Sequence, residues 1–497
     1  MSQATVRGIV DALRDAGLLV GTRGDLPNDV SSLTDDSRAV RAGSLFVAVR
    51  GSERDGHEYL ASAANSGASC AIVDDAARTP LPAILVNDTR RAASVAAAAF
   101  HGFPARELRL VGVTGTNGKT TTVGMLRHLL DERDARAASI GTLGVLVGSE
   151  GVVHPGGNGL TTPGPVELQR LLRELVDAGV RTVAMETSSH ALHQHRLDTL
   201  RFAAGVFTNL TRDHLDYHGT MEAYLGAKAM LIDLLAPGGT AVVNADDPSW
   251  ASLPPSPRRV RFGLECEAEV RALDVRFTPR GSVWTLAIGR ERQDVTLPLI
   301  GDFNVANALA AAAAGWALGL PLTRIADRLR SMPQVPGRLE IVNEHPVVLR
   351  DYAHTPDALE RALGAVRPFA TRRLIVVFGC GGDRDRGKRP EMGRIAQRGA
   401  DLAIVTSDNP RTEDPERILD DIEAGMTTGG HERIEDRRTA IAHAIAAAGD
   451  GDVVLLAGKG HETYQIRGTV KYPFDEREIV GEIVHELAGE RLPTRTR

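Results

Sequence analysis

Short apolar runs alternate with longer mixed segments along the last third of the chain. Four of these runs lie between residues 346 and 458 and read PVVLRD, RRLIVVFG, DLAIVTSD and DVVLLAG. The first three are each followed by a loop and by a segment with helical spacing. This alternation predicts a right-handed parallel sheet in which the loops after the strands share one edge.

Charged and amide side chains occur in all four of these loops. If the sheet forms as predicted, they converge on one cleft; they are Asp351, His354, Arg384, Asp408, Asn409, Arg411, Lys459 and Glu462. Ordinary surface loops would also be polar. Glycines and paired arginines at so many strand ends favour a functional cleft instead.

The middle of the chain repeats this pattern around a glycine-rich loop. The apolar run that ends at Thr114 continues as GTNGKTTT and then as a segment compatible with a helix. A strand, a glycine-rich turn with Lys119 and Thr120, and a following helix are typical of a loop that binds nucleotide phosphates. Val113 stands where the common pattern has its first glycine, so an ordinary glycine turn before a helix is the alternative.

Three further runs in the middle segment, TVAME, AAGVFTN and TAVVNAD, end in polar residues. Parallel strands place such residues at one sheet edge, so Glu186 and His214 should lie near Lys119. Together with the hydroxyl of Thr120, these donors suit Mg²⁺ or Mn²⁺ better than a structural Zn²⁺. The histidine-rich stretch between residues 190 and 218 has no tetrahedral zinc spacing.

The first part of the chain reads as a small α/β unit. Strands are predicted at residues 44–49, 70–73 and 84–86, between alanine-rich helical stretches, and a boundary is predicted near residues 104–108. The cluster Asp36, Ser37 and Arg38 precedes a buried strand. By itself it is more typical of a turn cap than of a ligand site.

Two-residue alternation between residues 267 and 299 predicts a few antiparallel strands, which a strong helix, GDFNVANALAA, then follows. Asp302 and Asn304 are candidates to cap this helix, although Asn304 would also suit an adenine ring. The Pro- and Gly-rich residues 333–338 predict a linker into the last domain.

The overall composition is that of an ordinary globular chain with about three domains. The chain has 497 residues, 42% of them hydrophobic, and a formal net charge of −6, which argues against a generic nucleic-acid binder. Three widely spaced cysteines fit a reducing compartment. We find no signal core and no uninterrupted apolar span, so a cytoplasmic location without membrane insertion is expected.

Six or more motifs in order resemble the Mur ligase family over nearly the whole chain. They are TGTNGKTTT, METSSH, FTNLTRDHLDYHG, GDFNVANALAA, GRLE, DYAHTPDAL, and SDNPR followed by AGKGHE. The resemblance implies an α/β chain of three domains: a uridine-nucleotide domain (1–106), a central phosphate-loop ATPase domain (107–336) and a Rossmann-like amino-acid domain (337–497).

The resemblance also implies roles for single residues. ATP is assigned to Gly115, Thr116, Asn117, Gly118, Lys119, Thr120, Thr121, Asn304, Arg338, Asp351 and His354. The UDP-linked substrate is assigned to Ser37, Thr161, Thr162, Ser188, Gln194 and Arg196. The amino-acid substrate is assigned to Arg384, Asp408, Asn409, Pro410, Arg411, Gly458 and Glu462. Mg²⁺ is assigned to Thr120, Glu186, His214 and a carbamate on Lys228, and the catalytic set is Lys119, Lys228, His214 and Glu186.

Family likeness alone points to the carbamate, because an unremarkable helix lysine is the default for Lys228. A carbamate requires a neutral amine and therefore a lowered lysine pKa. The expected reaction is ATP-dependent addition of meso-diaminopimelate to UDP-MurNAc-L-Ala-D-Glu by a monomer. A guanidinium fork such as Arg411 pairs with the second carboxylate of diaminopimelate and has no use for the bare ammonium of lysine.

Several alternatives are weighed beside this expectation. L-Lysine in place of diaminopimelate would keep the reaction and change the pocket. A folylpolyglutamate synthetase-like ligase would not need the first domain. A motor or signalling ATPase and a non-catalytic nucleotide-binding scaffold complete the alternatives; the intact Lys119, Thr120 and Glu186 disfavour the last.

Overall fold

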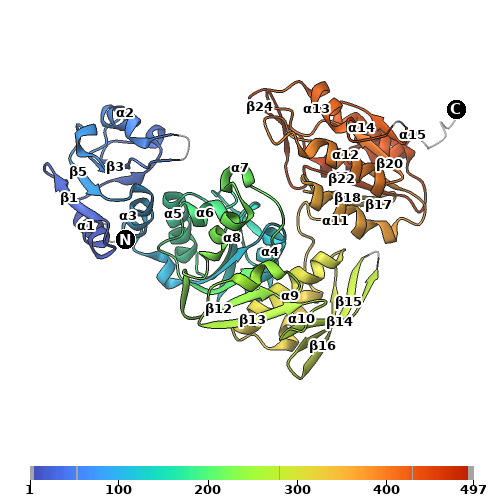
Figure 1. Ribbon diagram of the computed structural model, residues 1–497, viewed down its shortest axis with the longest axis horizontal. Helices are drawn as coiled ribbons and strands as arrows, with labels where there is room; N and C mark the ends of the chain where they lie inside the picture. Colours follow the sequence, from blue (N-terminus) through green and yellow to red (C-terminus); the bar gives the residue numbers. More distant parts are fainter. Residues whose placement is uncertain (1–4, 52–53, 158, 279, 428, 491–497) are drawn as a thin grey trace, which may run out of the picture. The chain divides into compact units, whose positions relative to one another are not determined.

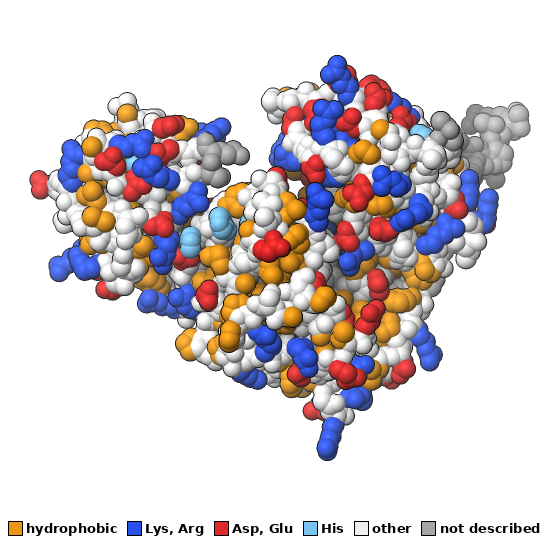
Figure 2. All heavy atoms as spheres, in the orientation of Figure 1, with side chains coloured by type: hydrophobic (Ala, Val, Ile, Leu, Met, Phe, Trp, Pro, Cys, Tyr) orange, Lys and Arg blue, Asp and Glu red, His pale blue; other side chains and the backbone are white. Residues whose placement is uncertain are grey.

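A computed structural model describes residues 5–51, 54–157, 159–278, 280–427 and 429–490. The chain forms two compact units. The first comprises Met1–Arg271, Leu286–Gln293 and Asn307–Arg328, and the second comprises Ala272–Thr285, Asp294–Ala306 and Leu329–Arg497. Figure 2 shows positive and negative side chains interspersed over the visible face, in keeping with the small net charge.

The first unit begins with a five-stranded sheet of order β1-β5-β4-β3-β2, parallel except for β1 against β5. Its strands are β1 (Leu19–Arg23), β2 (Ser32–Thr34), β3 (Ser44–Val47), β4 (Cys70–Val73) and β5 (Ala83–Val86). Helices α1 (Val6–Asp15) and α3 (Thr89–Phe100) pack on one face of the sheet. Helix α2 (Leu60–Asn65) packs on the other face. The three strands predicted from the sequence are present, and the first ends two residues early.

The larger sheet of the first unit has the order β13-β12-β11-β6-β10-β7-β8-β9. Its strands are β6 (Arg109–Thr114), β7 (Arg136–Gly141), β8 (Gly144–Val147), β9 (Val152–His154), β10 (Val180–Glu186), β11 (Phe202–Phe207), β12 (Leu235–Asn244) and β13 (Arg258–Gly263). The strands from β13 to β7 are parallel, so the residues after β6, β10 and β11 share an edge, as predicted.

Helices of this part are α4 (Lys119–Leu130), α5 (Pro165–Asp177), α6 (Ser189–His193), α7 (Leu215–His218) and α8 (Met221–Ala229). Figure 1 shows them in cyan to green around the larger sheet. The segment predicted as antiparallel strands contains β14 (Val270–Thr278), β15 (Gly281–Ile288) and β16 (Glu291–Leu297), and α9 (Asp302–Ala317) and α10 (Leu322–Arg330) follow.

The second unit holds a six-stranded sheet of order β17-β18-β22-β19-β20-β21, parallel except for β17. The strands are β17 (Glu340–Glu344), β18 (Val347–Asp351), β19 (Leu374–Phe378), β20 (Leu402–Val405), β21 (His431–Arg433) and β22 (Val453–Ala457), and a separate hairpin comprises β23 (Tyr464–Arg467) and β24 (Val470–Pro473). The four apolar runs of the sequence are thus neighbouring parallel strands, as predicted.

Helices cover both faces of this sheet (Figure 1). They are α11 (Pro356–Val366), α12 (Lys388–Gly399), α13 (Pro415–Glu423), α14 (Arg437–Ala447) and α15 (Glu476–Glu490). Thr355, Asp414 and Asp436 cap α11, α13 and α14 with side-chain oxygens that accept backbone N–H groups. In the part of the chain that the structure describes, no helix has the length and apolarity needed to cross a bilayer.

Candidate active site

The loop between β6 and α4 has the backbone geometry that the glycines of its sequence predict. Gly115 has φ +146°, and a Cβ there would lie 1.9 Å from Thr208 Oγ1 at the end of β11. Gly118 has φ +85°, and its Cβ would lie 2.3 Å from Asn307 Oδ1. Only glycine fits either position, because a side chain would collide and φ is unfavourable. Asn209 holds the loop by accepting from the N–H of Asn117 at 2.9 Å.

Two lysines donate to the same carbonyl oxygen beneath this loop. Lys119 Nζ lies 3.0 Å from Gly115 O and 2.8 Å from Thr116 O, and Lys228 Nζ lies 2.8 Å from Gly115 O. Lys228 is fully buried, 4.3 Å from the ring centre of Tyr224. Burial, and secondarily the charge of Lys119, holds the pKa of Lys228 well below its usual value. The neutral amine that a carbamate requires is therefore favoured at this position.

Glu186 ends β10 beside the phosphate loop. Its Oε1 accepts from Thr120 Oγ1 at 3.0 Å and from the N–H of Thr142 at 2.8 Å. A buried carboxylate and a hydroxyl in contact are oxygen donors of the kind that Mg²⁺ prefers, so the residues fit this ion. Among the described residues, no group of three or more His, Cys, Asp or Glu side chains has the arrangement of a metal site. The proposed set therefore depends on Thr120 and on the carbamate.

His214 adopts a left-handed conformation with φ +52° immediately before α7. Partial desolvation lowers its pKa, and the positive charge of Lys119 acts in the same direction. Its ring stacks edge-on against His190, with 4.8 Å between ring centres. His214 thus lies on the side of the loop that carries the two lysines, where the sequence predicts it.

Five residues assigned to the UDP-linked substrate form one connected group. Thr162 Oγ1 donates to Glu186 O at 2.8 Å and contacts Ser188 Oγ at 3.1 Å. Arg196 donates to Thr162 O at 2.9 Å and to Gln194 Oε1 at 2.6 Å. Thr161 joins through Thr142, at 3.5 Å between the hydroxyls. The group therefore extends directly from Glu186.

The sixth residue of that assignment, Ser37, lies in the first sheet domain. It begins a single 3₁₀ turn that Asp36 caps by accepting from the N–H of Arg38 at 2.9 Å. The predicted turn cap is therefore present. A role for Ser37 in binding uridine stays a prediction.

In the second unit, the residues assigned to ATP surround Tyr352. Asp351 Oδ2 accepts from the N–H of Leu339 at 2.7 Å, and burial raises the pKa of Asp351 to about 6 despite the nearby charge of Arg338. The guanidinium of Arg338 lies 4.8 Å from the Tyr352 ring centre, and His354 Nδ1 lies 2.8 Å from Tyr352 O.

Asn304, also assigned to ATP, lies inside the first turn of α9 and not at its N-cap. Its Nδ2 donates to Ile300 O at 2.8 Å, whereas Asp302 Oδ1 accepts from the N–H of Phe303 at 2.7 Å. Asp302 is the first residue of α9, and its bond to the N–H of the next residue is not the bond to the second or third helical N–H that an N-cap makes, so capping by either side chain stays a prediction. A contact between Asn304 and the adenine stays a prediction.

Two loops at the carboxyl edge of the second sheet carry Arg384 and Arg411. Arg411 Nη1 donates to Gly382 O at 2.9 Å, and a Cβ on Gly381 would lie 2.9 Å from that nitrogen. The buried Arg389 joins both loops, because it donates to Glu413 Oε1 at 2.8 Å and to Gly381 O at 3.2 Å. Gly381 therefore leaves room for the Arg411 guanidinium, and Gly382 leaves room for the carbonyl oxygen of Pro410.

The residues after β20 and β22 form a connected polar group at this edge of the sheet. Asn409 Nδ2 donates to Glu462 Oε2 at 2.8 Å, and the fully buried Lys459 donates to Asn409 Oδ1 at 3.1 Å. Asp408 is buried, and its Oδ2 has no hydrogen-bond partner in the described part of the chain. A Cβ on Gly458 would lie 2.6 Å from that oxygen, so glycine is needed here too. Pro410 continues the same loop.

Several residues that touch the site carry no assignment from the sequence. Thr142 binds Glu186, Asn209 holds the phosphate loop, and Asn307 contacts Thr122 at 3.4 Å next to Gly118. Asn307 stands one helical turn after Asn304, and that spacing was the available signal. Thr142 follows an apolar run as Glu186 does, but it carries no charge to attract attention.

With this geometry in place, comparison with known proteins defines the class of protein. Models described as "Mur ligase family, catalytic domain", "Mur ligase middle domain" and "Mur ligase, glutamate ligase domain" match residues 29–108, 113–315 and 337–460. The chain belongs to the Mur ligase family.

Particular relatives cover nearly the entire chain. The UDP-N-acetylmuramoyl-L-alanyl-D-glutamate–2,6-diaminopimelate ligase of Geobacillus kaustophilus is 45% identical over 92% of this chain and 95% of its own length. The protein of the same name from Geobacter metallireducens is 47% identical over 94% and 96%.

Solved structures agree with the fold. A 2,6-diaminopimelate ligase of that name is 33% identical, with a TM-score of 0.65 over 94% of this chain and 97% of that one. MurF ligase from Thermotoga maritima in complex with ADP has a TM-score of 0.67 over 93% and 98% at 20% identity. Folylpolyglutamate synthase of Mycobacterium tuberculosis, complexed with ADP, has 0.64 over 74% and 91% at 21% identity. The last two likenesses concern the fold alone.

Proposed function

We infer that this chain is an ATP-dependent ligase that joins meso-2,6-diaminopimelate to the γ-carboxylate of D-glutamate in UDP-MurNAc-L-Ala-D-Glu, a step of peptidoglycan precursor synthesis. The observation that carries this inference is the guanidinium of Arg411, which is held at Gly382 O beside the group of Asn409 and Glu462, in a chain whose relatives at 45–47% identity bear the name of that reaction. The enzyme is proposed to act as a monomer in the cytoplasm.

The first step joins two anions, because the γ-carboxylate attacks the γ-phosphorus of ATP. An O–P bond forms, the bond to ADP breaks, and an acyl phosphate results. Lys119 and the N–H groups at the start of α4 stabilise charge on the transferring phosphoryl group. Thr120, Glu186, His214 and carbamylated Lys228 would hold Mg²⁺, which adds positive charge against the same repulsion.

The second step forms the amide. The amine of diaminopimelate attacks the acyl carbon, a tetrahedral intermediate develops, and phosphate leaves as the amine loses a proton. Arg411 orients the amine by pairing with the distal carboxylate of the amino acid, and Glu462 accepts from an ammonium. Thr162, Ser188 and Arg196 hold the peptide end of the acceptor.

The first test is phosphate release by the purified protein with ATP, Mg²⁺ and UDP-MurNAc-L-Ala-D-Glu, with either meso-diaminopimelate or L-lysine added. Release that depends on diaminopimelate and barely responds to lysine is expected. Preference for lysine would keep the ligase and refute the reading of the Arg411 pocket. Release from ATP alone would refute the ligase and favour a motor-type ATPase. Lys119→Met is the control for phosphate from a contaminating enzyme.

A further inference from the structure

One arginine on α3 has a guanidinium that is fixed by a single hydrogen bond through its Nε. Arg90 Nε donates to Arg50 O at 2.6 Å, and the side chain is half-buried. Within the described ranges, neither Nη atom of Arg90 has a hydrogen bond or an ion pair. Its neighbour Arg91 differs, because its Nε donates to Asp198 at 2.9 Å. The backbone N–H groups of both residues are taken up by Asp88.

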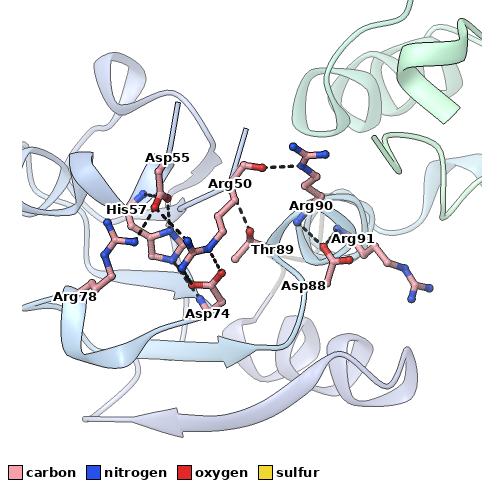
Figure 3. Close-up of polar contacts among 9 residues, drawn as sticks. All are labelled: Arg50, Asp55, His57, Asp74, Arg78, Asp88, Thr89, Arg90 and Arg91. Carbon is pink, nitrogen blue, oxygen red and sulfur yellow. Dashed lines mark hydrogen bonds and ion pairs between the residues drawn. The ribbon is translucent and has the colours of Figure 1, made fainter. Parts of the chain in front are cut away.

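Figure 3 shows how Arg90 differs from Arg50 and Arg78, two other cations of the first sheet domain. Arg50 and Arg78 turn toward Asp55 and Asp74, which also enclose His57, and each pairs with at least one of these carboxylates. Arg90 points away from this cluster, toward the green ribbon that follows the first domain. Arg90 and Arg91 both lie at this end of α3, and because Arg91 pairs with Asp198, Arg90 is the one whose charge meets no carboxylate among the described residues.

Arg196 follows α6, in the part of the first unit that holds the larger sheet. It lies near Arg90, at the junction between that part and the first sheet domain. Desolvation lowers the pKa of Arg196, and the charge of Arg90 lowers it further. The junction is held locally, because Ser94 Oγ on α3 donates to His195 O at 2.6 Å. Asp35 is the carboxylate whose charge reaches Arg196 from the first domain. Arg196 donates through Nε, Nη1 and Nη2 to Gln194 Oε1 and Thr162 O, and Arg91 pairs with Asp198, whereas the two Nη atoms of Arg90 have no partner in the described part of the chain.

We propose that Arg90 binds the diphosphate of the UDP-linked substrate. The proposal rests on the proposed function, in which the first domain takes the uridine end and the group around Arg196 takes the peptide end. The part of the substrate between those ends consists of the diphosphate and a sugar, and the diphosphate is the part with negative charge. A fixed guanidinium with free N–H groups suits phosphate oxygens, and a phosphate also offsets the repulsion between Arg90 and Arg196.

The test uses the full chain with three variants, Arg90→Met, Arg90→Lys and Arg91→Met. Arg90→Met should raise the KM for UDP-MurNAc-L-Ala-D-Glu about 10- to 100-fold, as expected for loss of hydrogen bonds to a charged group. The KM for ATP and the kcat should stay within about twofold of wild type. The KM of Arg90→Lys for UDP-MurNAc-L-Ala-D-Glu should lie between those of wild type and Arg90→Met, because lysine keeps the positive charge and loses the forked pair of N–H donors. Arg91→Met should keep the wild-type KM.

A competition experiment identifies the group that Arg90 recognises. UDP and uridine are compared as inhibitors of wild type and of Arg90→Met. The inhibition constant for UDP should rise in the variant, whereas that for uridine should not change. An equal rise for both inhibitors, or an equal KM rise in Arg91→Met, would refute the proposal because it points to a structural role of this end of α3. An unchanged KM for the UDP-linked substrate in Arg90→Met would refute it because Arg90 then makes no contribution to binding.

Failure of the proposed function would look different. Wild-type protein would then release no phosphate that depends on the UDP-linked substrate, and UDP would not compete. Substrate-dependent release by wild type together with an unchanged KM in Arg90→Met refutes the role of Arg90 alone.

Discussion

Replacing Arg411 by methionine tests the proposed amino-acid specificity. Arg411 uses one N–H to hold Gly382 O at 2.9 Å, and its other side-chain N–H groups have no hydrogen-bond partner among the described residues. We expect them to bind the distal carboxylate of diaminopimelate. Each hydrogen bond to a charged group contributes about 1.5–3 kcal/mol, so losing one lowers kcat/KM for diaminopimelate about 10- to 150-fold. Arg411 has φ +51°, and unbranched methionine avoids the added cost of a β-branched residue there.

The assay measures amine-dependent phosphate release with diaminopimelate and with L-lysine at saturating ATP. Lysine has no distal carboxylate, so its rate should change less than about threefold, and the preference for diaminopimelate should collapse. Arg467→Met is the matched control. Arg467 forms a β-bridge with Arg411, but its own guanidinium is paired with Glu435 at 3.2 Å. Equal losses for both amino acids in Arg411→Met would show that the arginine only supports the loop.

Three further changes test the interior of the site. Lys228→Met should lower kcat at least about 100-fold, and mass spectrometry in bicarbonate should show one added CO₂ on wild type only; a fully active variant would refute the carbamate. Gly115→Ala should raise the KM for ATP more than about tenfold, because its Cβ would lie 1.9 Å from Thr208 Oγ1; normal ATP binding would show that the loop relaxes. The buried Asp351 has a pKa of about 6, raised from 3.8. The folded protein therefore binds this proton more tightly than the unfolded chain does. The contribution of Asp351 to the free energy of unfolding is most favourable below pH 4, and about 3 kcal/mol of it is lost as the pH rises to about 6. Unfolding curves of wild type and Asp351→Asn should diverge by that amount over this window, and parallel curves would contradict the assigned pKa.

Apolar runs predicted the parallel strands well because strands buried on both faces carry few polar residues. The runs around residues 350, 376, 404 and 455 became β18, β19, β20 and β22, and the loops after them lie at one edge. Edge strands were harder to predict. β9 and β21 have three residues each, and such short pieces depend on pairing partners that a local pattern does not contain.

Candidate site residues can be recognised in the sequence when their charge or motif indicates their chemistry. Residues that matter only because the fold places them beside the site cannot be recognised in this way. Lys119, Glu186 and Arg411 are recognisable from charge, spacing and neighbouring glycines. Thr142 and Asn307 are neutral and become visible only when the fold brings them against Glu186 and Gly118. The contact of Arg90 with Arg50 O joins residues forty apart, which no local pattern reveals.

The shared oxygen beneath the phosphate loop gives a physical reason for the proposed carbamate. Lys119 and Lys228 both donate to Gly115 O, at 3.0 and 2.8 Å, and two ammonium groups at one carbonyl repel each other. Lys228 is the buried partner, so it is the one whose pKa falls and whose amine is free to react with CO₂. The reaction forms an N–C bond and releases a proton, and the product is an anion. Repulsion of Lys119 then becomes attraction, and the site gains a negative oxygen donor for Mg²⁺ beside Glu186 without a second acidic residue in the sequence.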